Sequence, residues 1–130
     1  MNLRIYLVMI ISISAACENQ DVRIPAIIPK PNHIQILKGK FDFNVSRTIY
    51  YNQPVLQESA RLLVSLLGNH GLSFEMIEAQ LPKDKERGIY LTLAEVGTLA
   101  DNTHRILIHQ KRIEVAASSI KDLKYGLQTI

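Results

Sequence analysis

The chain has 130 residues, one cysteine and no tryptophan, and its 15 Lys and Arg residues against 12 Asp and Glu residues give a net charge of +3. This length supports one domain or a piece of a larger protein, and it excludes a complete barrel hydrolase, which needs about twice as many residues. The single cysteine excludes an internal disulfide and a cysteine-based zinc site. A charge of +3 spread along the chain is too small to indicate nucleic-acid binding.

Residues 1–16 have the layout of a secretory signal peptide. Arg4 is their only charged residue, an apolar run follows over residues 5–13, and small residues occupy 14–16. The apolar run is too short for a membrane-spanning helix, which needs about 20 residues. Without Arg4, the mature chain keeps 14 basic residues against 12 acidic ones, a net charge of +2.

Cys17 directly follows Ala15 and Ala16, which resembles a bacterial lipobox, where the signal is cut before a cysteine that then carries lipid. The usual pattern has Leu three positions before the cysteine, where this chain has Ser14. We therefore expect lipid attachment at Cys17, a tether over residues 18–25, and an exported protein anchored to a bacterial membrane, in the periplasm or at the cell surface. The alternative is an ordinary cleaved signal with an incidental cysteine.

The first part of the mature chain predicts short extended segments followed by one long helix. Prolines at 29 and 31 indicate an extended entry, and alternation predicts a strand at 34–36, an extended piece or turn at 41–45 and a strand at 47–51. Residues 54–69 predict a helix that starts at a proline and ends at a glycine. Its apolar stripe consists of Leu56, Ala60, Leu63 and Leu67, and Glu58 and Arg61 form an outward pair.

The second part predicts strands, a hairpin and a last helix. Alternation places strands at 72–76, 88–93, 105–109 and 112–116, with a charged loop at 81–87 and a two-residue hairpin link at 110–111. Ser119 with Asp122 resembles a capping box for a helix whose apolar face carries Ile120, Leu123, Leu127 and Ile130. No stop signal follows Ile130, so we expect a cut chain. The predicted fold is α+β, a mostly antiparallel sheet with two helices packed on one face.

No motif in the sequence indicates chemistry. The four histidines (His33, His70, His104 and His109) have no metal-binding spacing, and neither a nucleophile elbow nor a glycine-rich phosphate loop occurs. The five tyrosines could form a sugar-stacking platform, but they lie on different predicted elements, where strand packing is the commoner role. We therefore assign no catalytic residue, no metal ligand and no cofactor.

Five segments taken in order resemble a known family. They are residues 28–31 (Ile-Pro-Lys-Pro), 58–63 (Glu-Ser-Ala-Arg-Leu-Leu), 88–91 (Gly-Ile-Tyr-Leu), 112–117 (Arg-Ile-Glu-Val-Ala-Ala) and 125–130 (Tyr-Gly-Leu-Gln-Thr-Ile). Together they resemble the N-terminal non-catalytic domain of bacterial β-N-acetylhexosaminidases, glycoside hydrolase family 20, over residues 26–130. The family often has Gly shortly before the Tyr-Gly pair, where this chain has Lys121-Asp122-Leu123.

The resemblance implies a sheet with two helices on one face that precedes a catalytic (β/α)8 barrel. Catalysis in the family is substrate-assisted and uses an Asp-Glu pair in the barrel, an exception to the usual two-carboxylate scheme. No position of this chain matches that pair, so the resemblance supplies no catalytic residue here.

The first hypothesis is a hexosaminidase accessory domain that lacks its barrel and is inactive alone. Its partners would be the barrel, N-acetylhexosamine-containing glycans through the parent enzyme, and a membrane through the lipid anchor. We expect Leu123, Leu127 and Ile130 to be exposed as the surface on which the barrel docks. The second hypothesis is a self-contained surface lipoprotein that binds glycans or a partner protein, with a complete last helix and no large exposed apolar patch.

Overall fold

The computed structural model describes residues 26–27, 30–36, 38–79, 86–95 and 97–130. The predicted signal peptide, Cys17, the tether and most of the predicted 81–87 loop lie outside the described residues. The elements in chain order are β1 (Thr48–Tyr51), the 3-10 turn η1 (Pro54–Leu56), α1 (Gln57–Gly68), β2 (Glu75–Glu78), β3 (Gly88–Leu93), β4 (His104–Ile108), β5 (Arg112–Ala117) and α2 (Ile120–Leu127).

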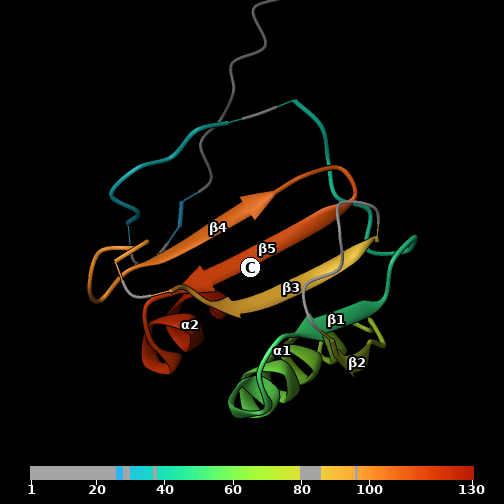
Figure 1. Ribbon diagram of the computed structural model, residues 1–130. Helices are drawn as coiled ribbons and strands as arrows, with labels where there is room; N and C mark the ends of the chain where they lie inside the picture. The colour runs from blue at the N-terminus through green and yellow to red at the C-terminus, as the bar shows by residue number, and fades with distance from the viewer. Residues whose placement is uncertain (1–25, 28–29, 37, 80–85, 96) are drawn as a thin grey trace, which may run out of the picture.

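The strands form one mixed sheet in the order β2-β1-β3-β5-β4, shown in Figure 1. Three of its pairings, β1 with β2, β1 with β3 and β3 with β5, are parallel, and only β4 with β5 is antiparallel. The prediction of a mostly antiparallel sheet was therefore wrong. Helix α1 connects β1 to β2 and returns the chain along the sheet. Both strands therefore begin at the same end of the sheet, as in other parallel strand pairs joined by a helix.

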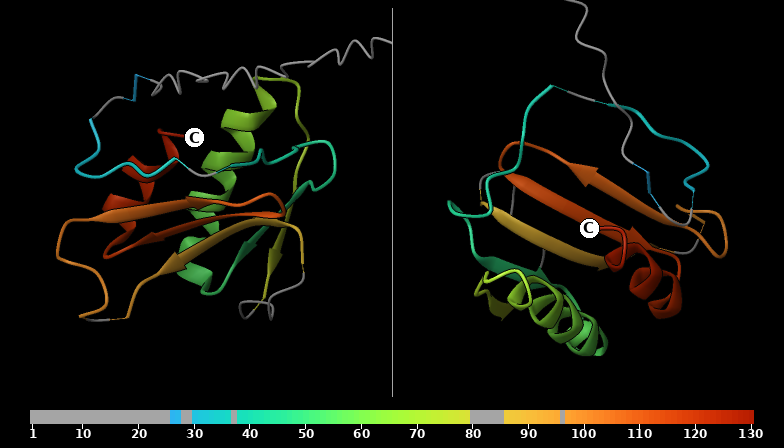
Figure 2. Two further views of the ribbon diagram at one scale, coloured as in Figure 1. Left: turned by 90° about the horizontal axis from the view of Figure 1, so that it is seen from above. Right: turned by 180° about the vertical axis from the view of Figure 1, so that it is seen from behind.

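Both helices cover the same face of the sheet, as predicted (Figures 1 and 2). Every second residue of the three central strands is buried beneath them. These buried residues are Ile49 and Tyr51 on β1, Ile89 and Leu91 on β3, and Ile113, Val115 and Ala117 on β5. Alternation in the sequence therefore identified the inward face correctly, although it left the strand directions open.

The predicted apolar stripe of the first helix is confirmed. Leu56, Ala60, Leu63 and Leu67 are all buried in the hydrophobic core, and Leu56 lies in η1, the 3-10 turn that begins at Pro54. On the opposite side, Glu58 and Arg61 form the expected i,i+3 ion pair at 3.0 Å. Both side chains are mostly exposed, so this pair adds little stability.

The segment before β1 differs from its prediction. Residues 34–36 form no strand, and Ile34 and Ile36 stay partly exposed. Residues 43–45 form a turn closed by a hydrogen bond from Val45 N–H to Asp42 O. Phe43 packs edge-on against Phe74, with 6.3 Å between ring centroids, so aromatic contacts hold this segment on the core instead of strand pairing.

The hairpin between β4 and β5 is confirmed, with Ile106 opposite Val115 and a two-residue link at 110–111. His109 N–H donates to Arg112 O at 2.8 Å and closes the turn.

Within the described residues, no helix is long and apolar enough to cross a membrane.

Gly88 allows β1 and β3 to lie close together at the start of β3. A Cβ at this position would lie 2.7 Å from the Tyr50 ring and 2.8 Å from Thr48 O, and its φ of +159° disfavours L side chains. We predict that Gly88→Ala lowers the free energy of unfolding by about 1–3 kcal/mol through overpacking. Gly68→Ala is the control, because a Cβ there meets nothing within 4 Å. Urea unfolding of both variants measures the difference, and equal stability would contradict this account.

Candidate functional site

Helix α2 carries Leu123 and Leu127 of the predicted docking face, and a hydrogen-bond network fixes its first turn. Asp122 N–H donates to Ser119 Oγ at 3.2 Å, and the Ser119 hydroxyl donates back to Asp122 Oδ2 at 2.5 Å. The Ser118 hydroxyl lies 3.1 Å from the same carboxylate oxygen and accepts from Thr103 N–H, which ties the helix start to the loop before β4. The predicted cap is confirmed, and Asp122 is buried by it.

The inward face of α2 belongs to the core and not to an exposed docking surface. Leu123 is fully buried and Leu127 is 1% exposed, whereas Ile130, beyond the end of the helix, is 38% exposed. The expectation that all three are exposed was therefore wrong for Leu123 and Leu127. The reason is geometric: the apolar stripe of α2 packs against β3, β4 and β5 of its own domain, which satisfies it without a partner.

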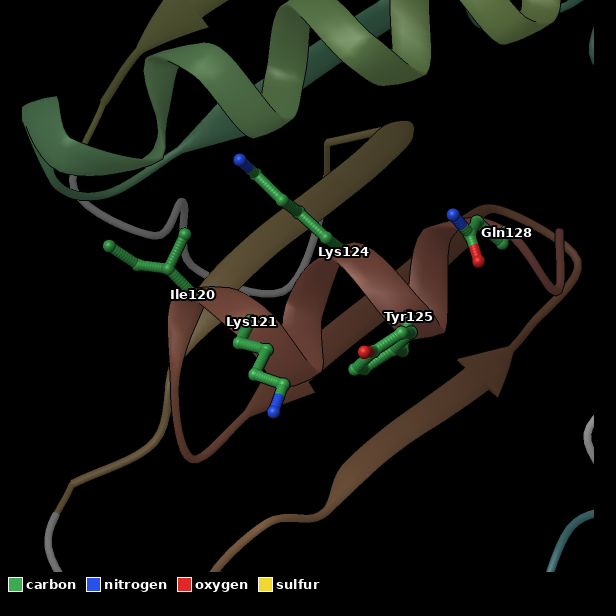
Figure 3. A pocket seen from close by; sticks show the side chains of 5 residues that line it. All are labelled: Ile120, Lys121, Lys124, Tyr125 and Gln128. Carbon is green, nitrogen blue, oxygen red and sulfur yellow. The ribbon is translucent and has the colours of Figure 1, made fainter.

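The outward face of α2 carries a different set of residues, which we name the α2 outer strip: Lys121, Lys124, Tyr125 and Gln128. With Ile120 they line a shallow hollow of about 470 Å³ (Figure 3). Lys121 Nζ lies 6.0 Å from the centroid of the Tyr125 ring, at the outer limit of a cation–π contact. In this view Lys124 points away from Lys121 and Tyr125, on the opposite side of the helix. The sequence-based prediction did not identify this strip, although its residues recur at i,i+3 and i,i+4 spacing on the helix face opposite the apolar stripe.

Two tyrosines come together on the sheet face opposite the helices. Tyr50 on β1 and Tyr90 on β3 are direct register partners, and their rings stack with centroids 4.9 Å apart. The two tyrosines lie on separate strands, as predicted, but the parallel pairing of β1 with β3 brings their rings together. Tyr90 is only 4% exposed and its hydroxyl donates to Glu86 O at 2.9 Å, so its ring is used in packing.

Burial of the same pair alters its titration. Burial, then the neighbouring Tyr50 and Glu86, raise the pKa of Tyr90 to about 12. Burial followed by Glu86 also raises the pKa of Tyr50. Because the pKa of Tyr90 in the folded protein exceeds the unfolded value of about 10, the neutral hydroxyl contributes its full share to the free energy of unfolding below pH 10. That contribution is lost as the pH rises from about 10 toward 12.

The remaining polar groups do not assemble a reaction centre in the described part of the chain. His33, His70 and His109 are exposed, whereas His104 is partly buried and its ring lies against Gly126 of α2. Glu114 pairs with Arg112. Among the described residues, no three His, Cys, Asp or Glu side chains come close enough to hold a metal ion.

The cap of α2 generates a stability prediction. Ser119→Ala removes the side-chain acceptor for Asp122 N–H, so we expect the free energy of unfolding to fall by about 1 kcal/mol. Ser65→Ala, an exposed position in α1, is the control and should leave stability unchanged or slightly higher. Chemical denaturation followed by circular dichroism compares the two, and an undiminished stability of Ser119→Ala would mean that the cap contributes nothing.

The tyrosine pair generates a pH prediction. The wild-type chain should lose stability between pH 10 and 12, because the unfolded state releases the Tyr90 proton first. Tyr90→Phe should be less stable by about 1 kcal/mol at pH 8, where it lacks the hydrogen bond to Glu86 O, but its stability should fall less steeply above pH 10. Guanidinium unfolding at pH 8, 10 and 11.5 measures both effects, with Tyr125→Phe as the exposed-tyrosine control. Parallel profiles for wild type and Tyr90→Phe would refute the assignment.

Comparison with known proteins places this arrangement in a family. The family model described as glycosyl hydrolase family 20, domain 2, matches residues 24–130, which include every helix and strand of the fold. A search of the curated proteins found no match. Because the family model covers well over half of the chain, the chain belongs to glycosyl hydrolase family 20, of which it carries domain 2.

Proposed function

We propose that this chain is the non-catalytic accessory domain of a β-N-acetylhexosaminidase, an enzyme that removes terminal N-acetylhexosamine residues from glycans. The observation that carries the proposal is the family match over the whole described fold. Domain 2 of this family normally occurs in the same chain as a catalytic barrel. Hydrolysis would therefore take place in the barrel of the parent enzyme, and the domain described here would support that barrel.

Three of the acidic side chains in the described fold have structural partners, which agrees with a non-catalytic role for these three. Asp122 accepts hydrogen bonds in the α2 cap, Glu58 pairs with Arg61, and Glu114 pairs with Arg112. A general acid needs access to substrate and a pKa tuned toward the working pH. These three carboxylates have structural partners instead.

The proposal predicts that the 130-residue chain releases no nitrophenol from p-nitrophenyl N-acetyl-β-D-glucosaminide. An established hexosaminidase assayed in parallel confirms that the substrate and buffer support turnover. Robust turnover by the purified chain would overturn the assignment of a non-catalytic role.

The second candidate is a self-contained surface lipoprotein that binds glycans or a partner protein. One observation favours it: Leu123 and Leu127 are covered within the domain, and α2 has a complete N-terminal cap. The coding DNA beyond codon 130 separates the two candidates. A reading frame that continues into a barrel with an Asp-Glu pair supports the accessory domain, whereas a stop codon supports the self-contained lipoprotein or a pseudogene-like remnant.

We further propose that the protein is exported and carries lipid on Cys17, which rests on the small residues before that cysteine and the preceding apolar run. Inhibition of lipoprotein signal peptidase by globomycin should then cause the unprocessed form to accumulate. Cys17→Ser should block maturation in the same way. Normal processing under either condition would show that the cysteine is incidental.

A further inference from the structure

One motif of the sequence has no part in the proposed accessory role. Residues 44–46 are Asn-Val-Ser, the N-x-Ser/Thr tripeptide that oligosaccharyltransferases recognise when the middle residue is not proline. It is the only such tripeptide in the 130 residues. Asp42 lies two positions before the asparagine. Bacterial transferases accept the tripeptide when an acidic residue occupies that position, because a basic side chain of the enzyme binds its carboxylate. Residues 42–46 therefore match the bacterial form of the acceptor site.

The segment that leads into β1 presents this motif on its outer side. Phe41 and Phe43 pack against the hydrophobic core, with 5.1 Å between their ring centroids. Alternate side chains of an extended segment face opposite sides, and Asp42 and Asn44 are both exposed. The two phenylalanines thus hold the segment on the domain, while the carboxylate and the amide that the transferase recognises lie together at the surface.

The hydrogen bonds of Asn44 leave its side-chain nitrogen free. The backbone N–H of Asn44 donates to Asp42 Oδ1 at 2.8 Å, and Asn44 Oδ1 accepts from Arg47 Nη2 at 3.4 Å. Among the described residues, no hydrogen bond engages Asn44 Nδ2. Nδ2 is the atom to which an N-linked sugar is attached. A glycan on this nitrogen would therefore break no contact of the fold and would extend into solvent.

Ser46, whose hydroxyl the transferase binds, has a different environment. It is only 7% exposed, although its hydroxyl makes no hydrogen bond in the described part of the chain. The next residue already belongs to the sheet, since Arg47 O accepts from Glu75 N–H at 2.9 Å. The enzyme can therefore reach Ser46 only before this segment closes on the core, or when it opens locally. Transfer during export, before the chain folds, meets this condition.

We propose that Asn44 is an N-glycosylation site that a bacterial oligosaccharyltransferase modifies as the chain is exported. Asn44 Nδ2 forms a bond to C1 of the first sugar of a lipid pyrophosphate-linked oligosaccharide. The bond from C1 to the pyrophosphate oxygen breaks, the lipid pyrophosphate leaves, and Nδ2 loses one of its two protons. The inference goes beyond the accessory role, and it rests on the proposed export because these transferases act on the outer side of the plasma membrane.

The test uses bacterial cells that lack an oligosaccharyltransferase and receive one together with its lipid-linked oligosaccharide. The full chain is produced with its own signal, and in parallel with residues 1–17 replaced by a cleavable signal peptide of known function. The mass of the purified protein and of the peptide that contains Asn44 measures the fraction modified. A known acceptor protein in the same cells shows that the transferase is active.

We expect one oligosaccharide per chain, on Asn44. Asn44→Gln and Ser46→Ala should abolish the modification. Asp42→Asn should lower the modified fraction about tenfold, the factor that one charge-assisted hydrogen bond supplies, while it keeps a side-chain oxygen for the turn. Asn69→Gln is the matched control and should change nothing, because Asn69 is exposed but has no Ser or Thr two positions later. Circular dichroism checks that the variants fold, and two of them, Asn44→Gln and Asp42→Asn, replace exposed residues.

Three outcomes would overturn the inference. Absence of the oligosaccharide from the chain that carries the replacement signal would show that Asn44 is not an acceptor. Its presence in Asn44→Gln would identify another residue as the acceptor. An unchanged modified fraction in Asp42→Asn would refute the role of the carboxylate. By contrast, modification with the replacement signal but not with the chain's own signal would confirm the site and refute the proposed export.

Discussion

Burial of strand β3 on both of its faces is the constraint on which the rest of the structure depends. Ile89 and Leu91 lie under the helices, and Tyr90 lies under the stacked ring of Tyr50 on the other face. A strand in this position needs a neighbour on each edge and a cover on each side. The parallel partners β1 and β5, the two helices and the tyrosine stack provide these.

The need to cover this sheet also explains which residues of α2 are buried and which are exposed. A helix packed on a sheet can use only one stripe for the core, and here Leu123 and Leu127 fill that stripe. The residues that stay exposed on this helix lie at the complementary positions, among them Lys121, Lys124 and Tyr125. The apolar face that the sequence makes conspicuous therefore serves the fold, while the polar face is exposed to solvent.

Local sequence signals predicted the elements whose boundaries depend on neighbours along the chain. The strand at 88–93 was predicted with its observed bounds, the hairpin link was located correctly, and Ser119 with Asp122 identified the start of α2. Capping and two-residue links act over three or four residues, so a single sequence contains them completely. The strand expected at 34–36 has the same alternation but no pairing partner among the described residues, and it does not form.

The sequence by itself determined most of the residues that face the core, the start of α2 and, through the family to which the chain belongs, the class of enzyme that contains such a domain. Only the tertiary structure decided that the sheet is mainly parallel, that Tyr50 and Tyr90 stack, and that Leu123 and Leu127 are internal. Periodicity records that a side chain is buried, but whether its own sheet or a partner covers it depends on packing between elements far apart in the chain.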